Sequence, residues 1–276
     1  MKNKATHITL ILLILLVYLF VSAPPLLDAD TLQRSLQTRD ALSIINKLNG
    51  VARKLYTNHI VKDGKKAGLK FDENWEEDNV EAGPLPAQFL RLTSRALEES
   101  KVPLGLYLGS DYPINTANKF KGLQKQKFIK LKNTGESQYF YEIDTQRFYY
   151  MAEDVAISSA CTSCHNKHDD SPKTDWKLNN IMGATTWSYP DKKINHQQLI
   201  EMSVEFYNSV KSAYTTYLTE IESFKGKKPG VSNAWPKSGF SVPDLKTFMR
   251  EYEKLAGEII LQELVKLETV TEGELL

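Results

Sequence analysis

The chain has 276 residues, of which 41% are hydrophobic and 25% are charged, with 35 basic against 34 acidic side chains. This length and composition suit a globular protein with one substantial core or two small ones. The near-zero net charge and the scattered basic residues exclude the positively charged stripe that is typical of nucleic-acid-binding proteins.

The N-terminus carries an uncharged apolar run, Ile8 to Ala23, which two lysines precede. Its length of about 16 residues lies between the apolar part of a signal peptide and the roughly 20 residues that span a bilayer. Two prolines follow the small residues at its end, and signal peptidase tolerates proline poorly just after the cut. We therefore expect residues 1–25 to be a membrane anchor, with a cleaved signal peptide as the alternative. The positive-inside rule places the rest of the chain on the periplasmic or extracytoplasmic side, anchored or secreted.

Residues 31–190 predict helices followed by an antiparallel sheet. Apolar residues recur at three- and four-residue steps from Thr31 to about Val61, which predicts one long amphipathic helix, and a second helix is expected over about 87–100. Beyond Pro103 the period shifts towards two, with a basic helix interposed at 115–133 and a hairpin connection at 144–146. Strands are predicted within segments 104–113, 137–144, 147–157 and 182–190.

Residues 195–276 predict a helical extension, with helices over about 195–224 and 243–270. The first of these has apolar residues around much of its circumference. We therefore expect one face to pack on the preceding domain and another to pack on the last helix or on a second subunit. A homo-oligomer is thus one of the predicted states. The fold class predicted from all these elements is α+β.

Both cysteines lie in Cys161–His168, "CTSCHNKH", which follows the third strand in a segment predicted as a loop. C-x-x-C-H is the attachment pattern of haem c, in which Cys161 and Cys164 form thioethers with the porphyrin and His165 is the proximal iron ligand. A dithiol redox site would be expected early in a βαβ unit, and the preceding residues predict none. A zinc site would crowd four ligands into eight residues. Haem c (iron) is therefore the predicted cofactor.

The residues around this motif resemble a known family. "CTSCHNKHDDSPKTDWKLNNIMG" (161–183) is similar to the signature of a PAS-like c-type haem domain, domain of unknown function 3365, and segments 53–61, 84–89 and 106–113 are similar to its upstream motifs. The resemblance covers about residues 31–190. It implies a periplasmic sensor-type fold, with a long N-terminal helix on a PAS-like antiparallel sheet and a covalently bound haem.

That family often supplies the input domain of histidine kinases, nucleotide cyclases or chemoreceptors. No such output signature follows Pro190, so a signal would leave through a partner protein or as electrons. Asn179 and Asn180 stand where many relatives carry Gly and Asp, and we expect this to affect the local turn rather than the haem.

The distal iron ligand is left open by the sequence. His168 is only three residues from His165, so we expect it to hydrogen-bond a haem propionate or a loop carbonyl instead. His59 continues the apolar stripe of the first helix, which the family fold lays against the haem, and it is the candidate distal ligand. The alternatives are a vacant site, Tyr56, Met151 or Met182.

Lys173 and Trp176 follow the motif in "SPKTDWK". In one interpretation Lys173 neutralises the haem propionates and Trp176 covers the ring edge, which makes both cofactor-binding residues. In the other, the segment is a turn that Pro172 stiffens and Trp176 anchors. Both interpretations stay open.

These features predict a membrane-anchored, extracytoplasmic monohaem c-type protein that is not an enzyme, since no distal acid–base group is evident. As a sensor it would respond to a redox change or to a small gas such as NO, CO or O₂ through the coordination of the iron. As an electron-transfer cytochrome it would pass electrons to a redox partner protein in a respiratory or photosynthetic chain. An exchangeable distal ligand favours the sensor, and a stable six-coordinate iron favours the carrier.

Overall fold

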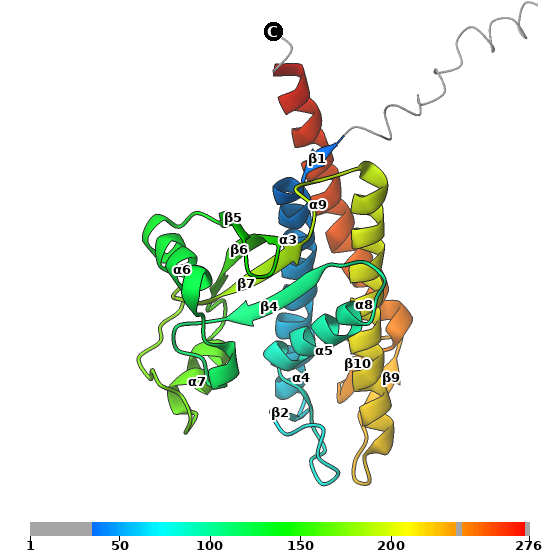
Figure 1. Cartoon of the computed structure of the whole chain (residues 1–276). Helices are drawn as coiled ribbons and strands as arrows, with labels where there is room; N and C mark the ends of the chain where they lie inside the picture. The colour runs from blue at the N-terminus through cyan, green and yellow to red at the C-terminus, as the bar shows by residue number, and fades with distance from the viewer. Residues whose placement is uncertain (1–34, 236–238, 274–276) are drawn as a thin grey trace, which may run out of the picture.

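The computed structural model describes residues 35–235 and 239–273, and side chains as far as Glu263. Three long helices, α3 (Thr38–Leu55), α8 (His196–Ser223) and α9 (Leu245–Gly273), pack together beside a four-stranded sheet (Figure 1). The predicted anchor over residues 1–25 lies outside the described residues. Within the described residues, no helix combines the length and the apolar character needed to cross a membrane.

All neighbouring strands of the sheet are antiparallel, in the order β4-β7-β6-β5. This confirms the four predicted strands. It also confirms the hairpin between the second and third strands along the chain, β5 and β6, where Gln146 adopts a φ of 52°. Trp187 of the central strand faces Leu106 on one side and Tyr150 on the other. The strands are β4 (Gly105–Gly109), β5 (Gln138–Glu142), β6 (Arg147–Val155) and β7 (Ile181–Tyr189).

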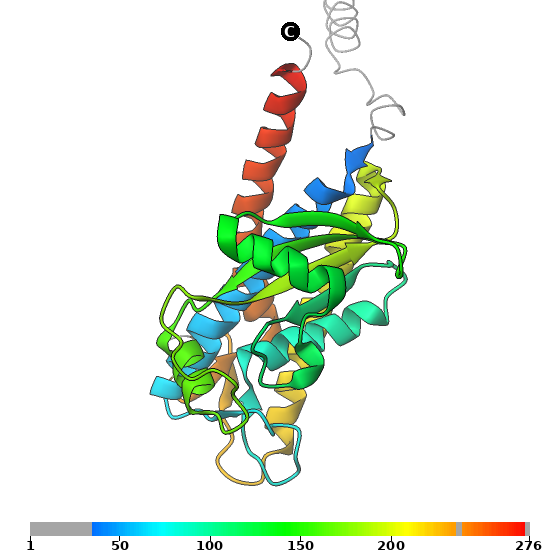
Figure 2. The ribbon, with the colours of Figure 1, turned by 60° about the vertical axis from the view of Figure 1, so that its left-hand side comes forward.

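Each face of the sheet is covered by a helix, and the alternation of side chains along the strands decides which residues meet which helix. On one face, Trp187 is fully buried against α3 and its Nε1 donates to Oδ1 of Asn46 at 3.0 Å. On the other, Met151 is buried beside Phe128 of α6 (Gly122–Thr134). Figure 2 shows α6 in front of the sheet and α3 behind it. The fold class α+β is therefore confirmed.

The first helix differs from its prediction at both ends. It begins at Thr38, after strand β1 (Leu36–Gln37), which pairs with β8 (Lys193–Ile194). From Tyr56 to Lys62 the chain forms a π-helix, η1, and it then returns to an α-helical turn, α4 (Asp63–Lys66).

The π-helix moves His59 off the predicted apolar stripe. A π-turn closes i→i+5 hydrogen bonds, so it holds more residues than an α-turn and shifts the buried face along the sequence. Ile60 and Val61 are buried in consequence, and His59 is exposed. The expectation that His59 continues the buried face of the helix is therefore wrong.

The segment after α4 is mostly irregular, as expected, and contains the short parallel pair β2 (Phe71–Asp72) and β3 (Gly83–Pro84). The second predicted helix is confirmed as α5 (Pro86–Glu98), which starts with a proline in its first turn, where the missing N–H costs nothing. The predicted basic helix is a 3₁₀ turn, η2 (Thr116–Asn118), followed by α6.

The C-terminal helices share one apolar core with the rest of the chain. Helix α8 begins at a capping box between Asn195 and Gln198 and packs on α3, α5 and α9. This confirms that it packs both on the preceding domain and on the last helix. A parallel pair, β9 (Gly230–Ser232) and β10 (Ser241–Pro243), connects α8 to α9. One cluster of buried side chains draws on α3, α5, the sheet, α8 and α9.

Two glycine substitutions should have opposite effects on stability. A Cβ at Gly183 would overlap the carbonyl oxygen of Gly109, where β4 and β7 approach closely, so Gly183→Ala should lower the free energy of unfolding by about 1–3 kcal/mol. A Cβ at Gly50, inside α3, would meet no atom within 4 Å, so Gly50→Ala should raise it by about 0.5–1 kcal/mol. Urea unfolding followed by circular dichroism measures both. Equal effects would contradict the close approach of the two strands.

Candidate functional site

The two cysteines lie on a helix, α7 (Ser159–Lys167), and not in the predicted loop. Ser158 caps the helix, because its Oγ accepts a hydrogen bond from the backbone N–H of Ala160 at 3.2 Å. At the other end, the N–H of His168 donates to the carbonyl of Cys164 at 2.9 Å. Cys, Thr, Ser and Asn are weak helix formers, which is why composition alone predicted a loop. The helix fixes the relative positions of the motif's side chains.

Cys161 and Cys164 are three residues apart on this helix, so their side chains lie on the same face, about one turn apart. Both thiols are free; Cys161 is half-buried and Cys164 is exposed. Partial loss of hydration raises the pKa of Cys164, and the nearby Glu73 carboxylate adds to this. Two free thiols so placed can reach adjacent points on the edge of one flat ligand.

His165 follows directly and is half-buried. Burial lowers the pKa of His165 below its usual value, although the carboxylate of Asp154 acts in the opposite direction. Burial therefore favours the neutral imidazole, which is the form that binds metal ions. Its buried Nδ1 has no hydrogen-bond partner among the described residues.

An ion pair holds Asp154 next to this histidine. Nη2 of Arg53, on α3, lies 2.5 Å from Oδ1 of Asp154, at the end of β6. Nη1 of the same guanidinium donates to Oγ1 of Thr185 on β7 at 3.4 Å. Arg53 thus connects the long helix to the two strands whose ends flank α7.

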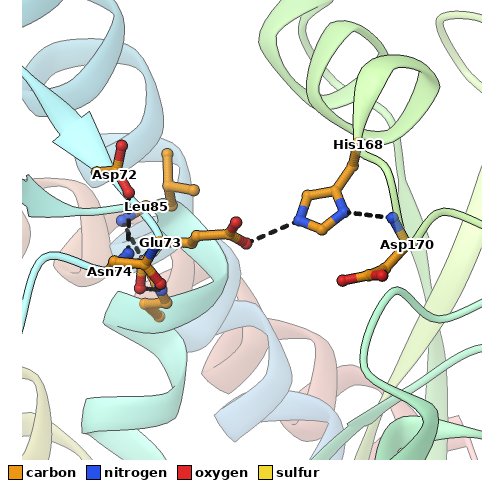
Figure 3. A network of polar contacts seen from close by, with 7 residues as sticks. Asp72, Glu73, Asn74, Leu85, His168 and Asp170 are labelled. Atoms are coloured by element: carbon orange, nitrogen blue, oxygen red, sulfur yellow. Dashed lines mark hydrogen bonds and ion pairs between the residues drawn. The ribbon is translucent and has the colours of Figure 1, made fainter.

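His168 has a different partner from the one predicted. Its Nε2 lies 2.8 Å from Oε2 of Glu73, and its Nδ1 accepts from the N–H of Asp170 at 3.1 Å (Figure 3). Because Nδ1 accepts, Nε2 carries the proton and donates to the carboxylate. Within the protein, Nε2 of His168 thus donates to Glu73, in the segment that follows β2, and not to a loop carbonyl.

The zinc alternative finds no support in the described part of the chain, which contains no group of three or more His, Cys, Asp or Glu side chains placed to hold a metal ion. His168, one of the four ligands that such a site would need, is hydrogen-bonded to Glu73.

Trp176 is buried and fastened to α7 through Asn166. Nδ2 of Asn166 donates to the carbonyl of Trp176 at 2.9 Å, and the N–H of Trp176 donates to Oδ1 of Asn166 at 2.8 Å. Lys173 is ion-paired with Asp175, and its Nζ lies 4.8 Å from the centre of the Trp176 ring. Trp176 therefore anchors the segment, as one of the two interpretations expected. Asn179 adopts a φ of 66°, a left-handed conformation that Gly would also allow.

Two of the candidate distal iron ligands, Tyr56 and Met151, are buried in the core. The hydroxyl of Tyr56 donates to the carbonyl of Pro84 at 2.8 Å, its ring stacks on Phe89, and burial raises its pKa well above the usual value. Met151 is fully buried between the sheet and α6. Both are therefore unsuitable as ligands in this arrangement.

His59 and Met182 remain accessible. Nδ1 of His59 lies 3.4 Å from Oδ2 of Asp63, and its ring meets Trp235 edge-on at 6.2 Å between centroids. Met182 is half-buried at the start of β7 and lines a cavity. Within the described residues, the side chain of His59 contacts Asp63 and Trp235, and neither of them belongs to α7.

Four residues near the motif were missed from the sequence: Arg53, Glu73, Asp154 and Asn166. Asn166 directly follows His165 in the C-x-x-C-H-N signature, which was the signal that could have found it. Arg53 opens one of the upstream segments of the resemblance. Glu73 and Asp154 meet their partners across 95 and 101 residues, and no local pattern marks such pairs.

A family model described as Tll0287-like matches residues 32–190, which is more than half of the 276 residues. The matched span includes the sheet, α7, both cysteines and Arg53. Comparison with curated proteins and with solved structures gives no match.

Proposed function

The chain belongs to the Tll0287-like family, which is a cytochrome-like family, and from this premise we propose that it is a monohaem c-type cytochrome that senses a redox change or a small gas outside the cytoplasm. The observation that carries the proposal is helix α7, which presents two free thiols on one face with a neutral histidine directly after the second. C-x-x-C-H in this form suits covalent haem attachment.

The chain's own groups have distinct tasks in this proposal. Cys161 and Cys164 would hold the porphyrin through thioether bonds, and His165 would hold the iron through its imidazole. Asn166 holds α7 against the Trp176 segment. Haem c, when bound, would supply one-electron redox chemistry.

The fold supports a PAS-like description and the resemblance to domain of unknown function 3365. A four-stranded antiparallel sheet has the long helix α3 on one face and α6 on the other. In the same proposal, residues 1–25 anchor the protein, and the domain lies on the extracytoplasmic side.

The link through Arg53 favours sensing over electron transfer. Arg53 connects Asp154, beside His165, to α3, and α3 leads back to β1 and the N-terminal segment. A π-helix, a common feature of functional sites, lies at the other end of α3. A displacement of His165 would therefore act through Asp154 and Arg53 on α3, and a partner protein could detect the movement of this helix. In the alternative, the protein passes electrons to a redox partner.

An absorption spectrum of the haem-loaded full chain, oxidised and reduced, with and without CO, tests the proposal. His59 is exposed and paired with Asp63, so we expect the reduced wild type to bind CO and His59→Ala to leave this unchanged. His196→Ala, at the start of α8, is the matched control.

The opposite outcome is a low-spin wild type that does not bind CO and a His59→Ala variant that is high-spin and binds CO. This result would identify His59 as the distal ligand. This outcome would favour electron transfer over sensing. A chain that carries no covalent haem would overturn both.

A further inference from the structure

The outer side of α6, the helix that covers one face of the sheet, carries a cluster of lysines. Residues 119–132 contain six lysines and no acidic residue, although the whole chain has a net charge of only +1. Lys121, Lys125 and Ile129 are spaced by four residues and form a row along the helix, with Lys130 next to Ile129. All four are exposed, and we call them the basic surface. Figure 2 shows α6 at the outside of the molecule, in front of the sheet.

The three lysines of the basic surface form no ion pair within the described residues. Lys132, in the last turn of the same helix, is by contrast paired with Asp111. The positive charge of the basic surface is therefore not neutralised by the part of the chain that the structure describes.

The placement of these lysines also opposes the stability of α6. Lys121 directly precedes the helix and Lys125 lies at the end of its first turn, which contains no acidic residue. Positive charge near the N-terminus of a helix opposes its dipole, and like charges four residues apart repel each other. A negatively charged partner would remove both unfavourable interactions. The cluster therefore indicates a binding role rather than a stabilising one.

The basic surface also offers apolar contacts. Ile129 is 41% exposed between the lysines. Ile143, at the end of β5, is 80% exposed, and Oε2 of the preceding Glu142 lies 3.5 Å from Nε2 of Gln124 on α6. Protein interfaces combine an apolar centre with a polar rim, and this surface has both components.

A lipid membrane fits the basic surface less well than a protein does. A helix that lies in a lipid interface inserts its large apolar side chains between the lipids. In α6 the large side chains Phe128 and Leu131 are buried in the cluster formed with the sheet, which leaves Ile129 as the exposed apolar residue of the basic surface. Charge with one small apolar contact suits a protein surface.

We propose that the basic surface is the docking site of a partner protein whose own surface is acidic and carries an exposed apolar side chain. Carboxylates of the partner pair with Lys121, Lys125 and Lys130, and the apolar side chain packs on Ile129. Attraction between exposed charges accelerates association and is screened by salt, so the complex forms and separates rapidly. The docking itself does not require haem. That the partner exchanges electrons with this protein or receives a signal from it rests on the proposed function.

Binding of acidic polymers to the purified full chain, held in phosphatidylcholine nanodiscs, tests the proposal. The probes are a copolymer of glutamate and tyrosine, poly-L-glutamate, and vesicles that contain phosphatidylglycerol. We expect the copolymer to bind in about 50 mM salt and at least about tenfold more weakly in about 0.5 M salt. The copolymer should also bind several times more tightly than poly-L-glutamate, and Ile129→Ser should remove this difference.

A triple variant locates the site on α6. Lys121→Gln/Lys125→Gln/Lys130→Gln should weaken binding by about tenfold, since each exposed ion pair contributes up to about fivefold. The variant should remain folded, because it removes charges that oppose the helix. The matched control replaces three exposed lysines of the connection after α8 and should stay within about twofold of the wild type: Lys225→Gln/Lys227→Gln/Lys228→Gln.

The double variant Cys161→Ser/Cys164→Ser separates docking from the proposed function. It lacks the attachment thiols and should bind the copolymer with unchanged affinity. A chain that carries no covalent haem but still binds the copolymer through α6 would contradict the proposed function and leave the docking site in place. Loss of copolymer binding in the double variant would contradict a docking that is independent of haem.

Four further results would overturn the proposal. One is that the α6 triple variant binds like the wild type. Another is that the two lysine triples weaken binding equally, since the effect would then follow from net charge alone. The third is binding to the phosphatidylglycerol vesicles and to neither polymer, which would identify a lipid surface as the partner. The fourth is self-association of the wild type that the α6 triple variant abolishes, which would identify a second copy.

Discussion

Replacement of both cysteines, Cys161→Ser with Cys164→Ser, is expected to abolish covalent haem attachment and leave the fold intact. Serine is close to cysteine in size, but its hydroxyl does not form a thioether with a vinyl group. The helix should persist, because Ser158 and Ala160 form its cap without either thiol. Cys161 makes only a 3.6 Å contact with Oγ of Ser158, so the free energy of unfolding of the haem-free chain should change by less than about 0.5 kcal/mol.

Haem staining after denaturing electrophoresis measures the attachment. The wild type should keep its haem and the double variant should lose all of it. Each single variant should keep one thioether, so its reduced pyridine haemochrome should absorb at a longer wavelength than that of the wild type. Ser163→Ala, on the same helix, is the matched control and should stain like the wild type. Haem that remains bound to the denatured double variant would contradict the roles of both cysteines.

Removal of every residue after Pro190 should prevent cooperative folding. The deletion takes away α8 and α9, which pack on α3, α5 and the sheet. Trp187 would lose Phe206, and Phe89 would lose Phe248. Loss of one large buried aromatic side chain costs about 3–5 kcal/mol. Several such losses exceed a typical total stability of about 5–15 kcal/mol. Gel filtration and thermal unfolding should therefore show aggregation and no cooperative transition.

A pair of point substitutions separates packing from chain length. Phe248 is 1% exposed and stacks on Tyr214 at 3.8 Å between ring centroids, so Phe248→Ala should lower the free energy of unfolding by about 3–5 kcal/mol. Leu261, on the same helix, is 64% exposed, so Leu261→Ala should change it by less than about 0.5 kcal/mol. A truncated chain that is soluble, unfolds cooperatively and has an unchanged haem spectrum would show that the first 190 residues fold alone.

The strands were predictable because their side chains alternate between two buried faces. Trp187 points to the α3 side, and Met151 points to the α6 side. Strands β5 and β6 in particular carried a period of two that was dense in aromatic residues, and this pattern is a strong local signal. Helices α5 and α8 were equally clear from their apolar spacing.

The surroundings of the motif were less predictable, for two physical reasons. A single π-turn at Tyr56–Lys62 changed which residues of the helix are buried, and extrapolation of a 3.6-residue period past Leu55 therefore misplaced His59. The partners of the motif also come from far along the chain, as with Glu73 for His168. The cysteine pattern itself, by contrast, was visible without any structure, because its chemistry depends on spacing alone.

The pairing of β1 with β8 has a consequence for the order of events while the chain is being made. Leu36 is among the first described residues to leave the ribosome, but its partner Ile194 is synthesised 158 positions later. At about 5–20 residues per second, that interval lasts roughly 8–30 s. Cys161 and His165 emerge within this interval, before the pair that closes the domain can form. The two thiols of α7 are therefore synthesised while this pair is still open, so that reagents or enzymes can reach them before β1 and β8 meet.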